Sequence, residues 1–236
     1  MKCILAIEAA TEACSVALWR DPDIQQRHEL TPRQHSQRLF GMLRELLSDG
    51  QLRAQGIEAV AYGSGPGSFT GLRIAASAVQ GLTFATGLPA IPVSTLACQV
   101  QTALREGLVG EGDLVLSTLD ARINEIYAQC YRIEQGLPEA IAAPRAVAPG
   151  QLSLPGEESN VFGLGSGLQF VDQFPRPVQA QLGGIDATLL PQAQDLIPLA
   201  IATASRGGLQ EPQQVQPIYV REEISWKKLS EQGKRK

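Results

Sequence analysis

The sequence predicts an α/β fold built from a duplicated unit. The chain has 236 residues, of which 44% are hydrophobic and only 5% aromatic, a mix that suits α/β packing better than a β-sandwich. Short apolar runs alternate with segments of helical periodicity. One pattern occurs twice, at 8–19 and at 120–131. In each case an acid at the end of an apolar strand is followed by a polar turn and a second strand with a terminal aromatic residue. The two segments share almost no identity, so they indicate either an old duplication or two independent hairpins.

The first half of the chain alternates between predicted strands and helices. Continuous apolar runs predict strands at 2–8, 13–19, 57–62 and 88–93, the first two forming a hairpin. Helices are expected at 34–47, 70–85 and 95–105. The first has apolar residues at helical spacing, and the second is rich in small residues. Both have more than one apolar stripe, which fits either core packing on two sides or a helix–helix interface with another subunit.

The second half repeats the strand pattern with longer loops. Strands are expected at 114–120, 125–131 and 161–164, a loop region with short strands at 136–160, and a helix at 191–206. We therefore divide the chain into an N-terminal lobe at 1–108, a C-terminal lobe at 109–206 and a tail at 207–236. The helix at 191–206 is open to packing back on the first lobe.

Charge and composition narrow the functional classes. The net charge of −4 makes the chain a poor non-specific binder of phosphate backbones. Locally, residues 221–236 contain six basic and three acidic residues, which fits a solvated end or an arm that touches RNA. The apolar run after the start ends at Glu8, and no long apolar segment is free of polar breaks, so we expect neither a signal peptide nor a membrane span. A cytoplasmic location follows.

A glycine-rich loop at 63–74 is the most informative motif. It follows a predicted strand and opens a predicted helix, so it fits either an anion site or a tight turn with Thr70 as the helix N-cap. It lacks the Lys-Ser/Thr of a Walker A loop, the acid of a dinucleotide-binding unit and the spacing of a nucleophile elbow. The loop residues that would adjoin a nucleotide are Gly65, Gly67, Ser68, Thr70, Gly71 and Arg73.

Two acids and two histidines are the other candidates for chemistry. Glu8 and Asp120 end predicted strands, where a carboxylate can hold Mg²⁺, orient a water or accept hydrogen bonds from turn amides. Asp120 could equally pair with Arg122. His28, on a predicted loop, and His35, at a helix start, are seven positions apart, and no H-x-x-x-H or H-E-x-x-H occurs. We therefore expect no metal site.

Four segments together resemble the TsaB (YeaZ) family. They are ILAIEAATEACSVAL at 4–18, HSQRL at 35–39, the glycine loop with GPGSFTGLRI at 65–74, and LDARINEIY at 119–127; the closing PIYVR at 217–221 agrees with them. The resemblance runs over nearly the whole chain. It implies a duplicated actin-like fold with two similar lobes, of the ASKHA type found in sugar kinases and Hsp70. Glu8 stands where this family commonly has Asp, which weakens a nucleotide or metal role for the first strand.

The resemblance implies a non-catalytic scaffold or activator subunit of a tRNA-modifying complex. With the related protein TsaD and the ATPase TsaE, such subunits serve the transfer of threonylcarbamoyl from threonylcarbamoyl-AMP to N6 of adenosine 37 in tRNAs reading codons that begin with A. TsaD carries the H-x-x-x-H metal motif that this sequence lacks, so we expect no catalytic role and no cofactor of its own. Contact with tRNA would be through the complex, and whether a nucleotide binds at the subunit interface stays open.

The resemblance also implies a heterodimer with TsaD through the helices at 34–47 and 70–85, and a homodimer by the same surface when TsaD is absent. The predicted interface residues are Leu39, Met42, Leu43, Leu46, Leu72, Ala75, Ala76 and Val79. Two other functions fit the residues less well. An ATP-dependent phosphotransferase of the sugar-kinase type would use the glycine loop and the strand-end acids, but lacks a basic cluster for the phosphates. A metallopeptidase would need paired histidines.

Overall fold

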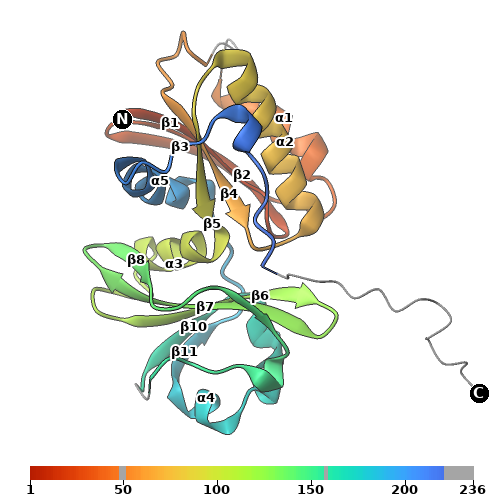
Figure 1. Cartoon of the computed structure of the whole chain (residues 1–236), viewed down its shortest axis with the longest axis vertical. Helices are drawn as coiled ribbons and strands as arrows, with labels where there is room; N and C mark the ends of the chain where they lie inside the picture. Colours follow the sequence, from red (N-terminus) through yellow and green to blue (C-terminus); the bar gives the residue numbers. More distant parts are fainter. Residues whose placement is uncertain (48–51, 157–158, 221–236) are drawn as a thin grey trace, which may run out of the picture.

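The computed structural model describes residues 1–47, 52–156 and 159–220, which form two lobes stacked along the long axis of the molecule (Figure 1). The first lobe is built on a five-stranded sheet in the order β3-β2-β1-β4-β5. Its strands are β1 (Cys3–Glu8), β2 (Ala13–Arg20), β3 (Asp23–Leu30), β4 (Ala59–Gly65) and β5 (Ala90–Ser94). The three first strands are antiparallel neighbours, and β4 and β5 run parallel to β1.

The second lobe repeats this strand order. Its path β8-β7-β6-β10-β11 places an antiparallel three-strand meander beside two parallel strands, and β9 adds to β7. Its strands are β6 (Leu114–Arg122), β7 (Glu125–Glu134), β8 (Leu137–Ala140), β9 (Arg145–Val147), β10 (Val161–Leu164) and β11 (Leu182–Asp186). The predicted duplicated, two-lobed actin-like α/β fold is therefore confirmed, and the two similar hairpins in the sequence are the first two strands of each sheet.

Helices cover both faces of the first sheet, so β1 is buried on both sides. Leu5 and Ile7 belong to a core shared with α1 (His35–Leu46) and α2 (Phe69–Thr86). Ile4 and Ala6 point the other way, into a core shared with α3 (Thr95–Arg105) and α5 (Leu196–Ser205). The short helix α4 (Arg176–Gln181) lies in the second lobe. Helix α5, though it follows the second sheet in sequence, lies against β5, β1 and β4.

Helix α3 joins the two lobes into one packed body. It lies between the two sheets (Figure 1) and contacts β4 and β5 on one side and β6, β7 and β8 on the other. The core that includes Ile4 and Ala6 also includes Val115, Leu119 and Tyr131 of the second lobe. A continuous apolar core across the boundary means that the lobes are not independent units joined by a linker.

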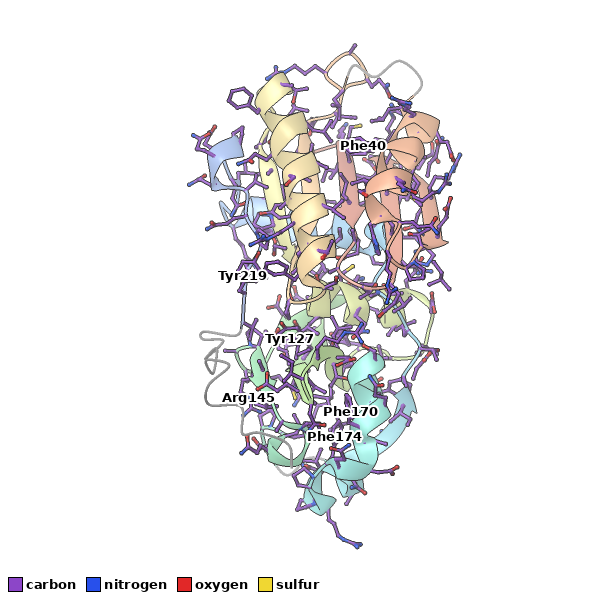
Figure 2. The ribbon with its side chains drawn as sticks, turned by 90° about the vertical axis from the view of Figure 1, so that its right-hand side faces the viewer. Phe40, Tyr127, Arg145, Phe170, Phe174 and Tyr219 are labelled. Atoms are coloured by element: carbon purple, nitrogen blue, oxygen red, sulfur yellow. The ribbon has the colours of Figure 1, made fainter. Side chains whose placement is uncertain are left out.

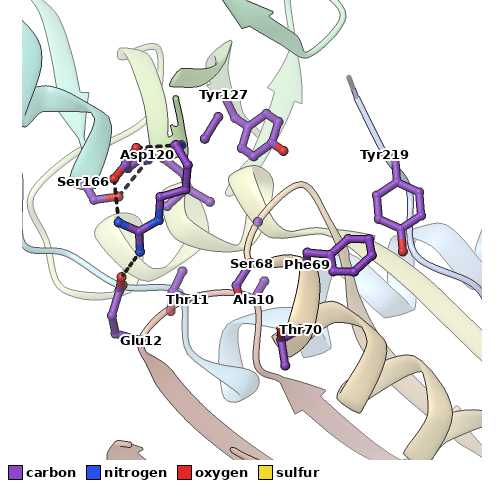
Figure 3. A pocket seen from close by; sticks show the side chains of 14 residues that line it. Ala10, Thr11, Glu12, Ser68, Phe69, Thr70, Asp120, Tyr127, Ser166 and Tyr219 are labelled. Atoms are coloured by element: carbon purple, nitrogen blue, oxygen red, sulfur yellow. Dashed lines mark hydrogen bonds and ion pairs between the residues drawn. The ribbon is translucent and has the colours of Figure 1, made fainter. Parts of the chain in front are cut away.

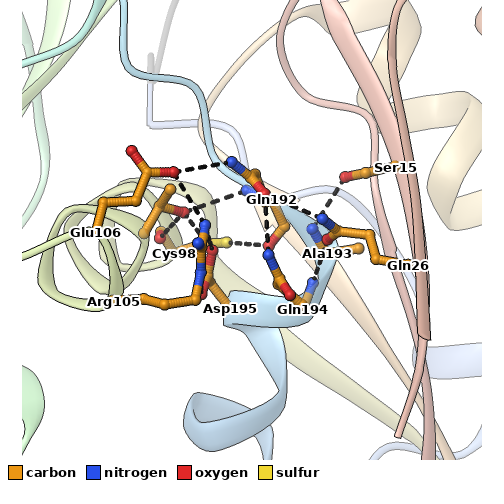
Figure 4. A network of polar contacts seen from close by, with 10 residues as sticks. Ser15, Gln26, Cys98, Arg105, Glu106, Gln192, Ala193, Gln194 and Asp195 are labelled. Carbon is orange, nitrogen blue, oxygen red and sulfur yellow. Dashed lines mark hydrogen bonds and ion pairs between the residues drawn. The ribbon is translucent and has the colours of Figure 1, made fainter. Parts of the chain in front are cut away.

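A polar network holds the chain where it returns from the second lobe to the first (Figure 4). Buried Asp195 accepts hydrogen bonds from Arg105 Nε at 2.8 Å and from Thr102 Oγ1 at 2.8 Å, both on α3. Next to it, the Ala193 N–H donates to Ser15 Oγ of β2 at 2.9 Å. Because a buried carboxylate needs such partners, the network fixes the start of α5 against both α3 and the first sheet.

Several elements differ from the sequence-based expectation. Strand β3 was not predicted, and it places His28 on a strand rather than a loop. Helix α5 begins only at Leu196, after a 3-10 turn at Ala193–Asp195, and not at 191. The strand β11 and the helix α4 were also missed. Within the described ranges, no helix has the length and apolar character needed to cross a membrane.

Candidate functional site

The glycine loop connects β4 to α2, and its glycines are explained by close contacts within the chain. A Cβ at Gly71 would lie 1.9 Å from the Ala9 carbonyl oxygen, and one at Gly67 would lie 2.5 Å from that of Ala10. Gly65 has a φ of +118°, a conformation open to glycine alone, and faces the backbone of the C-terminal segment at Ile218. Gly67 and Gly71 let the loop pack against the turn between β1 and β2, and Gly65 lets the C-terminal segment pass closely, so these glycines do not by themselves indicate a ligand.

Helix α2 is capped by Ser68, not by Thr70 as the tight-turn interpretation predicted. The Ser68 hydroxyl accepts a hydrogen bond from the Gly71 N–H, and its backbone N–H donates to the Ala10 carbonyl at 2.7 Å. Ser68 directly precedes the first helical residue, Phe69, and therefore occupies the N-cap position. Ser68, Thr70 and Arg73 are the exposed residues among the predicted loop set, and of these Ser68 caps the helix and Arg73 contacts Tyr219.

Glu8 is buried and faces the protein interior. Its Oε1 accepts a hydrogen bond from the Ala10 N–H at 2.7 Å, which confirms the turn-amide interpretation, while Oε2 has no hydrogen-bond partner among the described residues. Gly63 on β4 makes room for this carboxyl group, because a Cβ there would lie 1.9 Å from Oε2. Burial raises the pKa of Glu8 to about 7, against smaller lowering effects of backbone N–H groups and of the Thr95 side chain. A carboxyl group placed in this way cannot reach a ligand in the cleft.

Asp120 occupies the matching strand end of the second lobe and is held in a surface network. Its carboxylate accepts from the Arg122 N–H at 2.8 Å and from Arg122 Nη1 at 3.1 Å, and its own N–H donates to Ser166 Oγ at 3.0 Å. Arg122 also reaches across the cleft to Glu12 of the first lobe, at 3.6 Å. Both predicted roles of Asp120, pairing with Arg122 and capping the turn, are therefore confirmed.

These elements surround a pocket of about 820 Å³ between the lobes (Figure 3). The first lobe contributes the turn after β1 and the start of α2, and the second lobe contributes the turn between β6 and β7 and the residue Ser166. The lining residues are Ala10, Thr11, Glu12, Gly67, Ser68, Phe69, Thr70, Leu119, Asp120, Ala121, Arg122, Tyr127, Ser166 and Tyr219. The structure thus brings together part of the glycine loop and Asp120, whereas the buried Glu8 is not among the lining residues.

An aromatic cluster forms one rim of the pocket. The rings of Phe69 and Tyr219 lie 5.8 Å apart between centroids, and the Arg73 guanidinium lies 3.8 Å from the Phe69 centroid. Arg73 Nε also donates to the Tyr219 hydroxyl at 3.1 Å. Such stacked and hydrogen-bonded contacts hold the C-terminal segment at the mouth of the pocket. Tyr219 was not among the predicted site residues, because only folding brings it beside residues 150 positions earlier.

The eight residues predicted to face a partner are buried within the chain itself. Every one of them is at most 6% exposed, and all but Leu72 belong to the core between α1, α2 and the first sheet. The prediction that they form a partner surface is therefore wrong: Leu39, Met42, Leu43, Leu46, Leu72, Ala75, Ala76 and Val79 pack against their own sheet. Of the two interpretations of these helices, core packing accounts for these side chains.

The outer face of the same helices carries different residues (Figure 2). Phe40 on α1 is 50% exposed and Phe84 on α2 is 79% exposed. Gly41 and Gly81 lie inside these helices, where glycine costs about 1 kcal/mol relative to alanine. A Cβ at Gly81 would meet no atom of the described chain within 4 Å, so its own fold does not require the glycine. The sequence signal for this face is limited to a glycine inside each helix near a phenylalanine, Gly41 after Phe40 and Gly81 before Phe84.

The histidines do not form a metal site. His35 begins α1 and its Nε2 lies 2.9 Å from the Thr11 carbonyl oxygen, while His28 lies on β3. In the part of the chain that the structure describes, no three His, Cys, Asp or Glu side chains gather as a metal would require. The predicted basic tail at 221–236 lies outside the described residues.

Known proteins that match this chain are proteins of tRNA threonylcarbamoyladenosine formation. The family model described as TsaD, tRNA N6-adenosine threonylcarbamoyltransferase, matches residues 27–203. A protein of Escherichia coli (strain K12) named tRNA threonylcarbamoyladenosine biosynthesis protein TsaB is 38% identical over 232 residues, covering 96% of this chain and 97% of that protein. A protein of the same name from Haemophilus influenzae is 34% identical, covering 96% of each chain.

A solved structure agrees with the sequence relatives. YeaZ from Pseudomonas aeruginosa superposes with a TM-score of 0.85 at 38% identity, covering 93% of this chain and all of that one. Near-complete coverage of both chains at this identity means that the whole architecture is shared. The chain belongs to the TsaB (YeaZ) family of tRNA threonylcarbamoyladenosine biosynthesis proteins, as the motifs of the sequence predicted.

Proposed function

We propose that the chain is a cytoplasmic accessory subunit, without catalytic activity of its own, of the complex that makes threonylcarbamoyladenosine on tRNA. In this proposal TsaD carries out the transfer to N6 of adenosine 37, TsaE supplies ATPase activity, and this chain supports TsaD. The observation that carries the proposal is the exposed apolar face of α1 and α2, together with a buried Glu8 that cannot serve a ligand in the cleft.

The outer face of α1 and α2 is suited to packing against helices of another protein. It combines projecting rings, Phe40 and Phe84, with small residues, Ser77 and Gly81, that let a second backbone approach closely. We propose this face, defined by Phe40, Gly41, Ser77, Gly81 and Phe84 and called the α1–α2 face below, as the surface for TsaD, and for a second copy when TsaD is absent. Large apolar side chains exposed together typically mark such a surface.

The test replaces exposed residues rather than buried ones. A Leu43→Asp change would place a charge in the chain's own core and unfold it, so it cannot report on a partner. Gly81→Glu instead points a charged side chain outward, where it blocks a helix without disturbing the fold. The matched control is Ala180→Glu, which adds the same charge at an exposed position of α4 in the other lobe.

Purified chain, TsaD, TsaE, ATP, threonylcarbamoyl-AMP and unmodified tRNA are mixed, and modified adenosine is measured with and without the chain. We expect modification to depend on the chain, and Gly81→Glu to lose co-elution with TsaD by at least about tenfold, since a buried unpaired charge costs several kcal/mol. Ala180→Glu should behave like the parent. Equal modification without the chain would refute the accessory function, while equal co-elution of both variants would refute the α1–α2 face.

A further inference from the structure

The pocket between the lobes is bordered by the C-terminal segment, which is fixed on the first lobe. The Gln80 side chain donates to the Pro212 carbonyl at 3.3 Å, the Tyr62 hydroxyl donates to the Gln216 carbonyl at 3.3 Å, and the Ile218 N–H donates to the Ser64 carbonyl at 2.7 Å. These contacts guide the segment along the lobe until Tyr219 becomes part of the pocket lining. The chain beyond Val220 therefore starts at the mouth of the pocket.

The sixteen residues that follow, 221–236, combine apolar and basic side chains. Ile224, Trp226 and Leu229 are apolar, and Lys227 and Lys228 lie directly after the tryptophan. From Val220 to Trp226 an extended chain spans up to about 20 Å, which is enough to enter a pocket that begins at Tyr219. The stretch is long enough to fold back on its own starting point.

The pocket offers complementary chemistry to such a segment. Phe69, Leu119 and Tyr127 contribute ring and apolar surface, and its volume of about 820 Å³ exceeds the space needed for one indole. The charged lining residues are two carboxylates, Glu12 and Asp120, and one guanidinium, that of Arg122, which pairs with both. The lining residues carry one net negative charge, which Arg73 on the rim offsets, while the tail carries a net positive charge. The tail lysines can still meet the carboxylates of Glu12 and Asp120, and the aromatic surface would supply most of the binding energy.

We propose that the pocket is the docking site of the chain's own C-terminal segment 221–229, with Trp226 between Phe69, Leu119 and Tyr127, and the lysines beside Glu12 and Asp120. Docking makes the segment an internal competitor for any other occupant of the cleft. It does not depend on the accessory function proposed above, because the pocket and the α1–α2 face are separate surfaces.

Tryptophan fluorescence tests the proposal in the full-length chain. The chain has two tryptophans, so Trp19→Phe leaves Trp226 as the single reporter. The measurements are its emission maximum and its quenching by acrylamide. In this background we compare Phe69→Ser, which removes a ring from the pocket, with Phe84→Ser, which removes an exposed ring at the far end of the same helix.

We expect Trp226 to be shielded in the parent and in Phe84→Ser, and its quenching to rise by about threefold in Phe69→Ser, since a docked indole is protected by the aromatic surface that covers it. Replacing Lys227 and Lys228 by Glu should raise the quenching in the same direction. Trp226 that is quenched in the parent as readily as in urea would overturn the proposal. So would equal quenching in the two phenylalanine variants, or protection that disappears on dilution, which would mean docking onto a second copy.

Discussion

The two lobes have the same strand order and differ in what covers it. In the first lobe, the connections after β3 and β4 contain the 12-residue α1 and the 18-residue α2. In the second lobe, the matching connections contain β9 with a three-residue 3-10 turn, and an eight-residue 3-10 segment with the six-residue α4. In these matching connections only the first lobe has long helices, and the exposed phenylalanines of the α1–α2 face lie on them.

The acids at matching strand ends differ in the same way. Glu8 of the first lobe is enclosed by β4 and by the start of α3, whereas Asp120 of the second lobe lies in a turn shared with Arg122. Burial raises the pKa of Glu8, whereas the Asp120 carboxylate accepts hydrogen bonds from Arg122 in a partly exposed turn. A repeated strand–acid–turn pattern therefore does not imply a repeated chemical role.

The largest expected effect comes from a glycine in β4, compared with a glycine in the equivalent strand β10 at a different register position. A Cβ at Gly63 would lie 1.9 Å from Oε2 of the buried Glu8, whereas one at Gly163 would lie 3.2 Å from the Ile185 and Leu168 side chains. We expect Gly63→Ala to lower the free energy of unfolding by about 3 kcal/mol and Gly163→Ala by about 1 kcal/mol. Urea unfolding of both variants measures this difference, and equal losses would remove the asymmetry between the lobes.

The next prediction concerns pH. The pKa of Glu8 is raised from 4.5 to about 7 in the folded chain, so between these values the folded state holds a proton that the unfolded state releases. Stability from this group is therefore full below pH 4.5 and falls as the pH rises through 7, by about 3 kcal/mol in all. Glu8→Gln should remove this loss.

The measurement is the free energy of unfolding from urea titrations between about pH 4 and about pH 8, which brackets the interval in which this linkage acts. The difference between the parent and Glu8→Gln should grow in favour of the variant from pH 4.5 upward and level off above about 7. A parent and a Glu8→Gln variant with parallel pH profiles would contradict the burial argument.

The smallest effect is expected for the ion pair across the cleft. Arg122 and Glu12 are 75% and 53% exposed, and the pair measures 3.6 Å, so solvent screens it. We expect Glu12→Gln to change the free energy of unfolding by less than about 0.5 kcal/mol, and less still at high salt. Thermal unfolding at low and high ionic strength checks this. A loss comparable with that of Gly63→Ala would mean that the lobes depend on this contact rather than on α3.

Sequence reasoning succeeded where a local pattern decides the structure. The apolar runs that became β1, β2, β6 and β7 and the helical spacing that became α1 and α2 needed only the periods of strand and helix. It failed for β3, whose residues DIQQRHEL are mostly polar and exposed. That strand exists because its backbone pairs with β2 along its whole length, which is a long-range property.

By itself, the sequence determined the α/β class, the duplication, the family and the place of the glycine loop. Only the tertiary structure decided which side of α1 and α2 faces outward, that Gly67 and Gly71 serve a close approach of the first turn, and that Glu8 is enclosed. The physical reason is that a helix with two apolar stripes can bury either one. A carboxyl group likewise takes its pKa from neighbours such as Gly63 and Thr95, which are distant in the sequence.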